Sequence, residues 1–159
     1  MPAICPEPVY ATTAATVTVV GEAPRFSGQF ATTSGEQLFA ANGDLDLSNL
    51  RKPVAVTLTI TDPDRVFYQH GPVTVLEFSD LKNGHKQPIP TYHHQFRNTV
   101  QLSTDRRTVT FCYKNDDNGG DRRRRHAFRQ SSYGLKIGQE RPYVLTGGID
   151  PTISNGGND

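Results

Sequence analysis

The sequence predicts a single all-β domain, folded as an antiparallel β-sandwich of about eight to nine strands. Three observations support this fold class. Apolar residues recur with a period of two, and turn residues separate the short runs at fairly regular intervals. No window places apolar residues at the spacing i, i+3, i+4, i+7 that an amphipathic helix needs. A closed barrel is the alternative, because the number of strands does not separate the two architectures.

The clearest strand is "VAVTLTIT", residues 54–61. Its apolar residues occupy every even position: Val54, Val56, Leu58 and Ile60. Threonine and alanine occupy the odd positions, which point to the opposite face of a strand. The segment therefore predicts a strand with one buried face and one face in water.

Three further segments have the same alternation: 107–114, 131–137 and 142–149. In the first, Val109, Phe111 and Tyr113 share one face, and Cys112 lies on the other. In the second, the inward residues are Tyr133, Leu135 and Ile137. Weaker strand candidates are 14–20, 28–33, 44–48, 65–69, 73–78 and 98–103.

The connections between these segments carry turn residues. "TDPD" at 61–64 places proline at the second position of a type I turn. We expect at most one short helical turn, near residues 34–41. Two long loops are predicted at 79–98 and 115–130, and the terminal segments 1–12 and 152–159 are expected to be flexible.

The composition excludes a strong electrostatic field around the whole protein. The chain of 159 residues has 17 basic and 16 acidic side chains and a formal charge of +1. Any attraction to nucleic acid or to an anionic membrane would have to be local. No apolar run is long enough to span a membrane, and no secretory signal is recognisable, so we expect a cytoplasmic protein. Whether Cys5 and Cys112 pair stays open.

The C-terminal segment "YGLKIGQERPYVLTGGIDPTISNGG" is similar to the closing segment of the DP-EP family of small bacterial proteins. The residues that carry the resemblance are Tyr133, Leu135, Tyr143, Asp150, Pro151, Ile153 and Asn155. The segments "GDLDLS" and "VAVTLTITDP" resemble the family in layout. The resemblance covers about half of the chain, implies an immunoglobulin-like β-sandwich and implies no activity.

The segment "NDDNGGDRRRRHAFRQ", residues 115–130, contains the strongest local charge. Its candidate anion-binding residues are Arg122, Arg123, Arg124, Arg125, His126 and Arg129. Guanidinium groups suit phosphate or carboxylate, and Phe128 offers a surface on which a base can stack. Nearby aspartates neutralise part of this charge, so a solvated connection between two strands is the leading interpretation.

Metal ligation is the second possible chemistry. His85, His93 and His94 are weak candidates for a metal site, because adjacent residues of an extended chain point to opposite faces. His70 lies elsewhere in the sequence. Calcium would need several convergent oxygen atoms. The residues that offer them are Asp62, Asp64, Asn115, Asp116, Asp117, Asn118 and Asp121. Asx-turns explain this composition without a metal, and no cofactor is expected.

Two classes of function remain. The leading hypothesis is a non-enzymatic binding or assembly module, with a protein partner or self-association through loops and sheet edges. The alternative is an anion-binding protein that takes nucleic acid or a phosphorylated small molecule on Arg122 to Arg125. An enzyme with a loop-borne site is the third possibility. It would need Cys112 or the histidines to converge, and we expect Cys112 to be a half-buried, inert thiol.

Overall fold

The computed structural model describes residues 5–6, 8–71, 73–82, 85–89, 99–115 and 130–154, which contain β-strands and no helix. The strands are β1 (Ala11–Val20), β2 (Ser27–Gly35), β3 (Leu45–Asp46), β4 (Val54–Ile60), β5 (Arg65–Phe67), β6 (Leu76–Lys82), β7 (His85–Ile89), β8 (Gln101–Leu102), β9 (Thr108–Tyr113), β10 (Gln130–Gln139), β11 (Val144–Ile149) and β12 (Thr152–Ser154). The prediction of an all-β chain is confirmed. In the described residues, no helix is long and apolar enough to cross a membrane.

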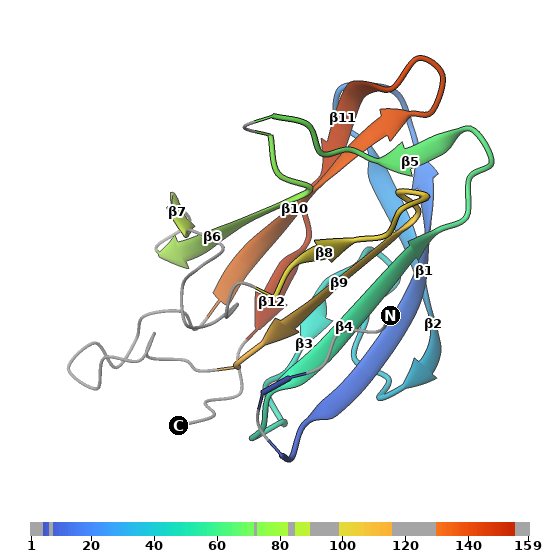
Figure 1. Ribbon diagram of the computed structural model, residues 1–159. Helices are drawn as coiled ribbons and strands as arrows, with labels where there is room; N and C mark the ends of the chain where they lie inside the picture. The colour runs from blue at the N-terminus through green and yellow to red at the C-terminus, as the bar shows by residue number, and fades with distance from the viewer. Residues whose placement is uncertain are drawn as a thin grey trace.

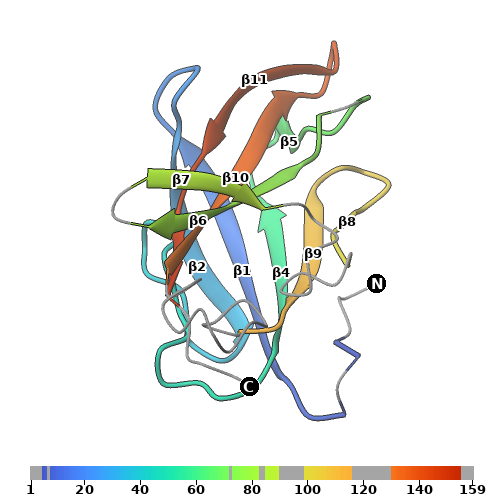
Figure 2. The same cartoon turned by 90° about the vertical axis from the view of Figure 1, so that its left-hand side faces the viewer.

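The strands form two separate sheets (Figure 1). Sheet A has the order β2-β1-β4-β9-β8, and sheet B has the order β3-β12-β10-β6-β7. Strand β10 is the centre of sheet B, because β11 and β5 also pair with it. The view turned by 90° shows β1, β4 and β9 running in one layer and β6, β10 and β11 in the other (Figure 2). The barrel alternative is wrong, since neither sheet closes on itself.

Both sheets are mixed, so the prediction of a purely antiparallel arrangement is wrong. Strand β1 runs parallel to β4, and β12 runs parallel to β3. Side chains alternate between the two faces in either kind of pairing. The sequence pattern therefore carries information about burial and none about the direction of the neighbouring strand.

The core lies between the inner faces of the two sheets. The expected inward residues of β4 and β9 are all buried there, as are Tyr133, Leu135 and Ile137 of β10. Phe78 of β6 meets Phe111 of β9 edge to face at 5.4 Å between ring centroids. The two layers thus share one apolar core.

Tyr133 is fully buried, and its hydroxyl donates a hydrogen bond to the carbonyl oxygen of Gly43. Burial raises the pKa of Tyr133 well above its ordinary value, and the nearby charge of Asp44 adds to the shift. The phenol is therefore neutral and acts as a donor inside the core.

Several predicted connections are strands instead. The expected loop 79–98 contains the end of β6 and all of β7, which pair as a hairpin. The β7 segment "HKQPI" has no apolar alternation, so it gave no strand signal. Residues 34–41 contain the end of β2 and a bridge from Phe39 to Leu45, and the helical turn expected there is wrong. At the termini, Ala11 and Thr12 lie in β1, and 152–154 form β12.

The two cysteines form a disulfide, with sulfur atoms 2.06 Å apart and Cα atoms 5.3 Å apart. Cys112 is outward-facing on β9, as expected, but Cys5 covers it and both are buried beside Ala55 of β4. The prediction of an inert thiol at Cys112 is therefore wrong. The partners are 107 residues apart, and sequence periodicity has no bearing on so distant a contact.

Candidate functional site

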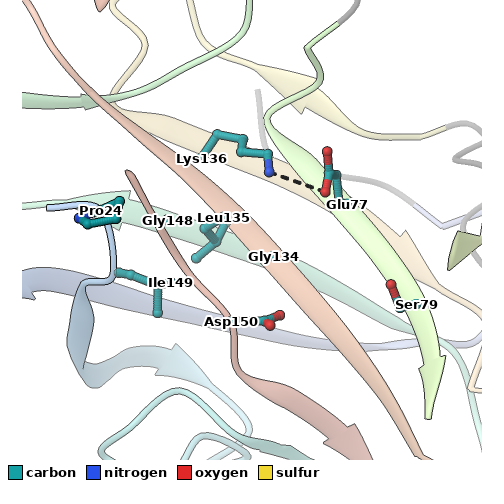
Figure 3. A pocket seen from close by; sticks show the side chains of 9 residues that line it. All are labelled: Pro24, Glu77, Ser79, Gly134, Leu135, Lys136, Gly148, Ile149 and Asp150. Carbon is teal, nitrogen blue, oxygen red and sulfur yellow. Dashed lines mark ion pairs between the residues drawn. The ribbon is translucent and has the colours of Figure 1, made fainter. Parts of the chain in front are cut away.

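A polar depression of about 250 Å³ lies on the outer face of sheet B (Figure 3). It lies over the middle of β10, between β6 on one side and β11 on the other. Its lining residues are Pro24, Glu77, Ser79, Gly134, Leu135, Lys136, Gly148, Ile149 and Asp150. We call this feature the sheet B depression.

Two glycines form the floor of the sheet B depression. Gly134 of β10 pairs with Glu77 of β6, and Gly148 of β11 pairs with Lys136 of β10. These positions face outward, because their neighbours Leu135 and Ile149 point into the core. The missing side chains leave the backbone of the two strands accessible from outside. A glycine inside a strand often marks such a close approach.

Charged groups surround this floor. The Nζ of Lys136 lies 3.2 Å from Oε2 of Glu77 and forms an ion pair across β10 and β6. The Glu77 side chain is 60% exposed, so water screens the pair and its contribution to stability is small. Figure 3 shows the Asp150 carboxylate beside Gly134. A Cβ placed on Gly134 would lie 3.7 Å from Oδ1 of Asp150.

This arrangement suits recognition of a charged group on another molecule. The Glu77 carboxylate can exchange ion-pair partners at little cost, because its side chain keeps most of its contact with water, whereas the Lys136 side chain is 25% exposed. A guanidinium or ammonium group can approach Glu77, while a carboxylate can approach Lys136. The volume is below the roughly 300 to 1,000 Å³ of pockets that enclose small-molecule ligands. A single side chain of a partner fits better than an enclosed metabolite.

The anion-binding candidates Arg122, Arg123, Arg124, Arg125, His126 and Arg129 lie outside the described residues, as does Phe128. Binding at this run therefore stays a prediction. Replacing Arg122 to Arg125 by serine should abolish any salt-sensitive binding of nucleic acid, and unchanged affinity would contradict it.

The histidines give no metal centre in the described part of the chain. His70 is exposed in a turn, where its backbone bonds to that of Val73 in both directions. His85 begins β7 by its backbone, while His93 and His94 lie outside the described residues. Among the residues that the structure does describe, no group of three or more histidine, cysteine or acidic side chains could hold a metal ion.

Of the calcium candidates, Asp62 and Asn115 contact backbone atoms, Asp64 lies in the turn after Asp62, and Asp116, Asp117, Asn118 and Asp121 lie outside the described residues. Oδ1 of Asp62 accepts a hydrogen bond of 2.9 Å from the Val19 amide, and Oδ2 lies 3.7 Å from the Arg65 guanidinium. The buried side-chain amide of Asn115 donates to the carbonyl oxygens of Leu50 and Lys52. These contacts explain Asp62 and Asn115 as turn and loop anchors.

The disulfide also removes Cys112 as a candidate nucleophile, because a sulfur bonded to Cys5 is not a thiolate. Sequence reasoning did not propose Glu77 or Lys136 as functional residues, and it noted Asp150 only for the DP-EP resemblance. One signal was present. The stretch "YGLK" in β10 places a glycine and a lysine on the outward positions of an otherwise buried strand. Its outward neighbours become visible only once the sheet order is known.

No protein-family model matches the sequence, and the search of curated proteins finds no match.

Proposed function

We propose that the protein is a non-enzymatic binding or assembly module that contacts a protein partner through the sheet B depression. The observation that carries this proposal is the partly exposed ion pair of Lys136 and Glu77 beside a glycine floor. A charged side chain of the partner can approach β10 there and form an ion pair with Glu77 or with Lys136. Oxidation of Cys112 supports a non-enzymatic role in one respect, because it leaves that sulfur without a nucleophilic form.

We further propose that the fold is an immunoglobulin-like sandwich related to that of the DP-EP family. Two layers around one core support it, and so do the buried positions of Tyr133, Leu135 and Ile153, which carry the resemblance. Loops and outer faces of such sandwiches are common recognition surfaces.

We place the protein in an oxidising compartment in preference to the cytosol expected from its sequence. Disulfides persist in secreted and periplasmic proteins and are rare where glutathione keeps thiols reduced. The Cys5–Cys112 bond is buried, with 3% and 0% of these residues exposed, so reductants reach it poorly.

The test is photo-cross-linking in the producing cells, with a photoreactive amino acid at position 79, which lines the depression. The control is the same amino acid at position 74, which is exposed and outside the lining. A covalent adduct specific to position 79 is expected. No adduct at 79, or the same adducts at both positions, would contradict the proposed site.

Two variants sharpen the test. The double exchange E77K/K136E keeps an ion pair but reverses the positions of the charges, so it should retain the fold and lose the adduct. Gly134→Leu fills the floor and should also lose it, whereas Gly134→Ala should keep it, because a Cβ there meets only ordinary contacts at 3.6 to 3.8 Å. Persistence of the adduct in both disruptive variants would place the contact elsewhere.

A further inference from the structure

The outer face of sheet A is covered by threonine. We call it the threonine face and define it by six residues of adjacent strands: Thr16, Thr18, Thr57, Thr59, Thr61 and Thr108. All six are outward-facing, since the residues between them point into the core. Five of them lie in β1, β4 and β9, which are side by side (Figure 1), and Thr61 directly follows β4.

Strand register aligns these residues in rows. Thr16 of β1 is opposite Thr59 of β4, and Thr59 is opposite Thr108 of β9. The hydroxyl oxygens of Thr18 and Thr61 are 2.8 Å apart, and those of Thr59 and Thr108 are 3.2 Å apart. The result is a surface of small side chains that presents methyl groups and hydroxyl groups together.

The threonine face carries no charge. No outward-facing residue within β1, β4 or β9 is acidic or basic, and the neighbouring strand β2 adds Gln29 and Ala31 at its outward positions. Charged residues make up 21% of the chain, so the charges are concentrated elsewhere. Depletion of charge distinguishes the centre of protein interfaces from the rest of a surface.

We propose that two copies of this chain associate through their threonine faces, sheet A against sheet A. An uncharged face does not repel its own copy, whereas two identical charged faces would. Each threonine hydroxyl can both donate and accept a hydrogen bond, so identical faces are complementary to each other. The small side chains let the two sheets approach closely. Val20, which is 40% exposed at one end of β1, adds apolar surface.

The available area sets the strength of this dimer. Four strands about 4.8 Å apart, averaging about eight residues at about 3.3 Å each, present at most roughly 500 Å² per copy. The two copies would bury at most about 1,000 Å² together, and less where the disulfide covers the face, which is at or below the lower limit for a specific interface. The disulfide covers the end of the face near Ala55, so the contact centres on the other end, at Thr18 and Thr61. The mutually neutralising ion pair of Asp62 and Arg65 borders this end. The expected product is a weak, reversible dimer.

This proposal goes beyond the sheet B depression and does not depend on it, since the two surfaces lie on opposite outer faces. The two also differ in salt response. Contact between uncharged faces should persist when salt is raised, whereas exchange of ion pairs at Glu77 and Lys136 should weaken. A failure of one proposal is thus distinguishable from a failure of the other.

The test is sedimentation equilibrium of the full, oxidised chain over a wide concentration range, at low and high salt. The average mass should rise from 17.6 kDa towards twice that value with concentration, at both salt levels. Thr18→Lys places an ammonium group in the contact and should weaken association by roughly tenfold or more. Thr61→Lys is a second, independent variant, because Thr61 is also exposed.

The matched control is Thr74→Lys, the same substitution at an exposed threonine outside sheet A. It should associate like the wild type, and circular dichroism should show that all three variants fold. A monomer at every concentration overturns the proposal. So does association that both sheet A variants leave unchanged, which would indicate edge-to-edge pairing, or association that salt abolishes.

Discussion

The two outer faces of this molecule differ more than the two inner faces do. Both sheets contribute large apolar side chains to one core. Outside, sheet A is uncharged, rich in threonine and covered at one end by a disulfide, whereas sheet B carries the Lys136–Glu77 pair above a glycine floor. Packing in the core constrains the residues of the inner faces, whereas the residues of the outer faces can differ according to what each face binds.

The largest expected change in stability comes from the disulfide on sheet A. Loss of the disulfide in the double variant C5A/C112A should lower the free energy of unfolding by about 2 to 4 kcal/mol, because the bond closes a very long loop in the unfolded chain. Urea denaturation of the oxidised wild type and of the variant measures the difference. Reduced wild type should match the variant. Equal stability of all three samples would show that the bond does not constrain the chain.

The second largest change in stability is expected from the buried hydroxyl of Tyr133, on the inner face of sheet B. Tyr133→Phe leaves the buried Gly43 carbonyl without its donor and should cost about 1 to 3 kcal/mol in unfolding free energy. Tyr143→Phe is the matched control, since the Tyr143 hydroxyl accepts from the Gln69 amide at a partly exposed position and water can replace it. Equal losses in the two variants would contradict the role assigned to burial.

The glycines of β10 provide a third comparison. A Cβ on Gly138 would lie 2.6 Å from the carbonyl oxygen of Val144, so Gly138→Ala must displace backbone and should cost roughly 1 to 2 kcal/mol. Gly134→Ala meets no such obstacle and should change the unfolding free energy by less than about 0.5 kcal/mol. Thermal denaturation of the two variants measures the difference. A larger loss of stability for Gly134→Ala than for Gly138→Ala would mean that the floor of the depression has no room for a Cβ.

The smallest effect is the response to acid. Hydrogen bonds from Ser48 lower the pKa of Asp46, and hydrogen bonds from Ser103 and the Arg107 amide lower that of Asp105. Both pKa values lie below the ordinary 3.8, so both groups stabilise the fold above that pH and lose the effect as pH falls through the folded values. The double variant D46N/D105N should therefore lose less stability than the wild type on acidification. An identical pH profile of the two proteins would count against these contacts.

Much of the fold follows from the sequence, because alternation reports burial directly. Val54 to Ile60 and Val109 to Tyr113 lie where the period of two predicts, and most weaker segments also form strands. Parallel pairing of β1 with β4 and the bond from Cys5 to Cys112 depend on distant parts of the chain, which local patterns do not report. The sheet B depression was missed for the same reason. Glu77, Lys136 and Asp150 come from three separate segments and converge only in the assembled sheet.

The bond between Cys5 and Cys112 also determines how the molecule resists force. Residues 5 to 112 form a covalent ring, so a pull on the two ends cannot extend the chain between the bonded positions, which have a sequence separation of 107. At about 3.5 Å per residue, roughly 370 Å of contour length stays inaccessible until the bond is reduced. Under tension, only the chain after β9, including β10 to β12, can be drawn out. The sheet A strands β1, β4 and β9 would remain joined as a closed loop after the centre of sheet B had been pulled away.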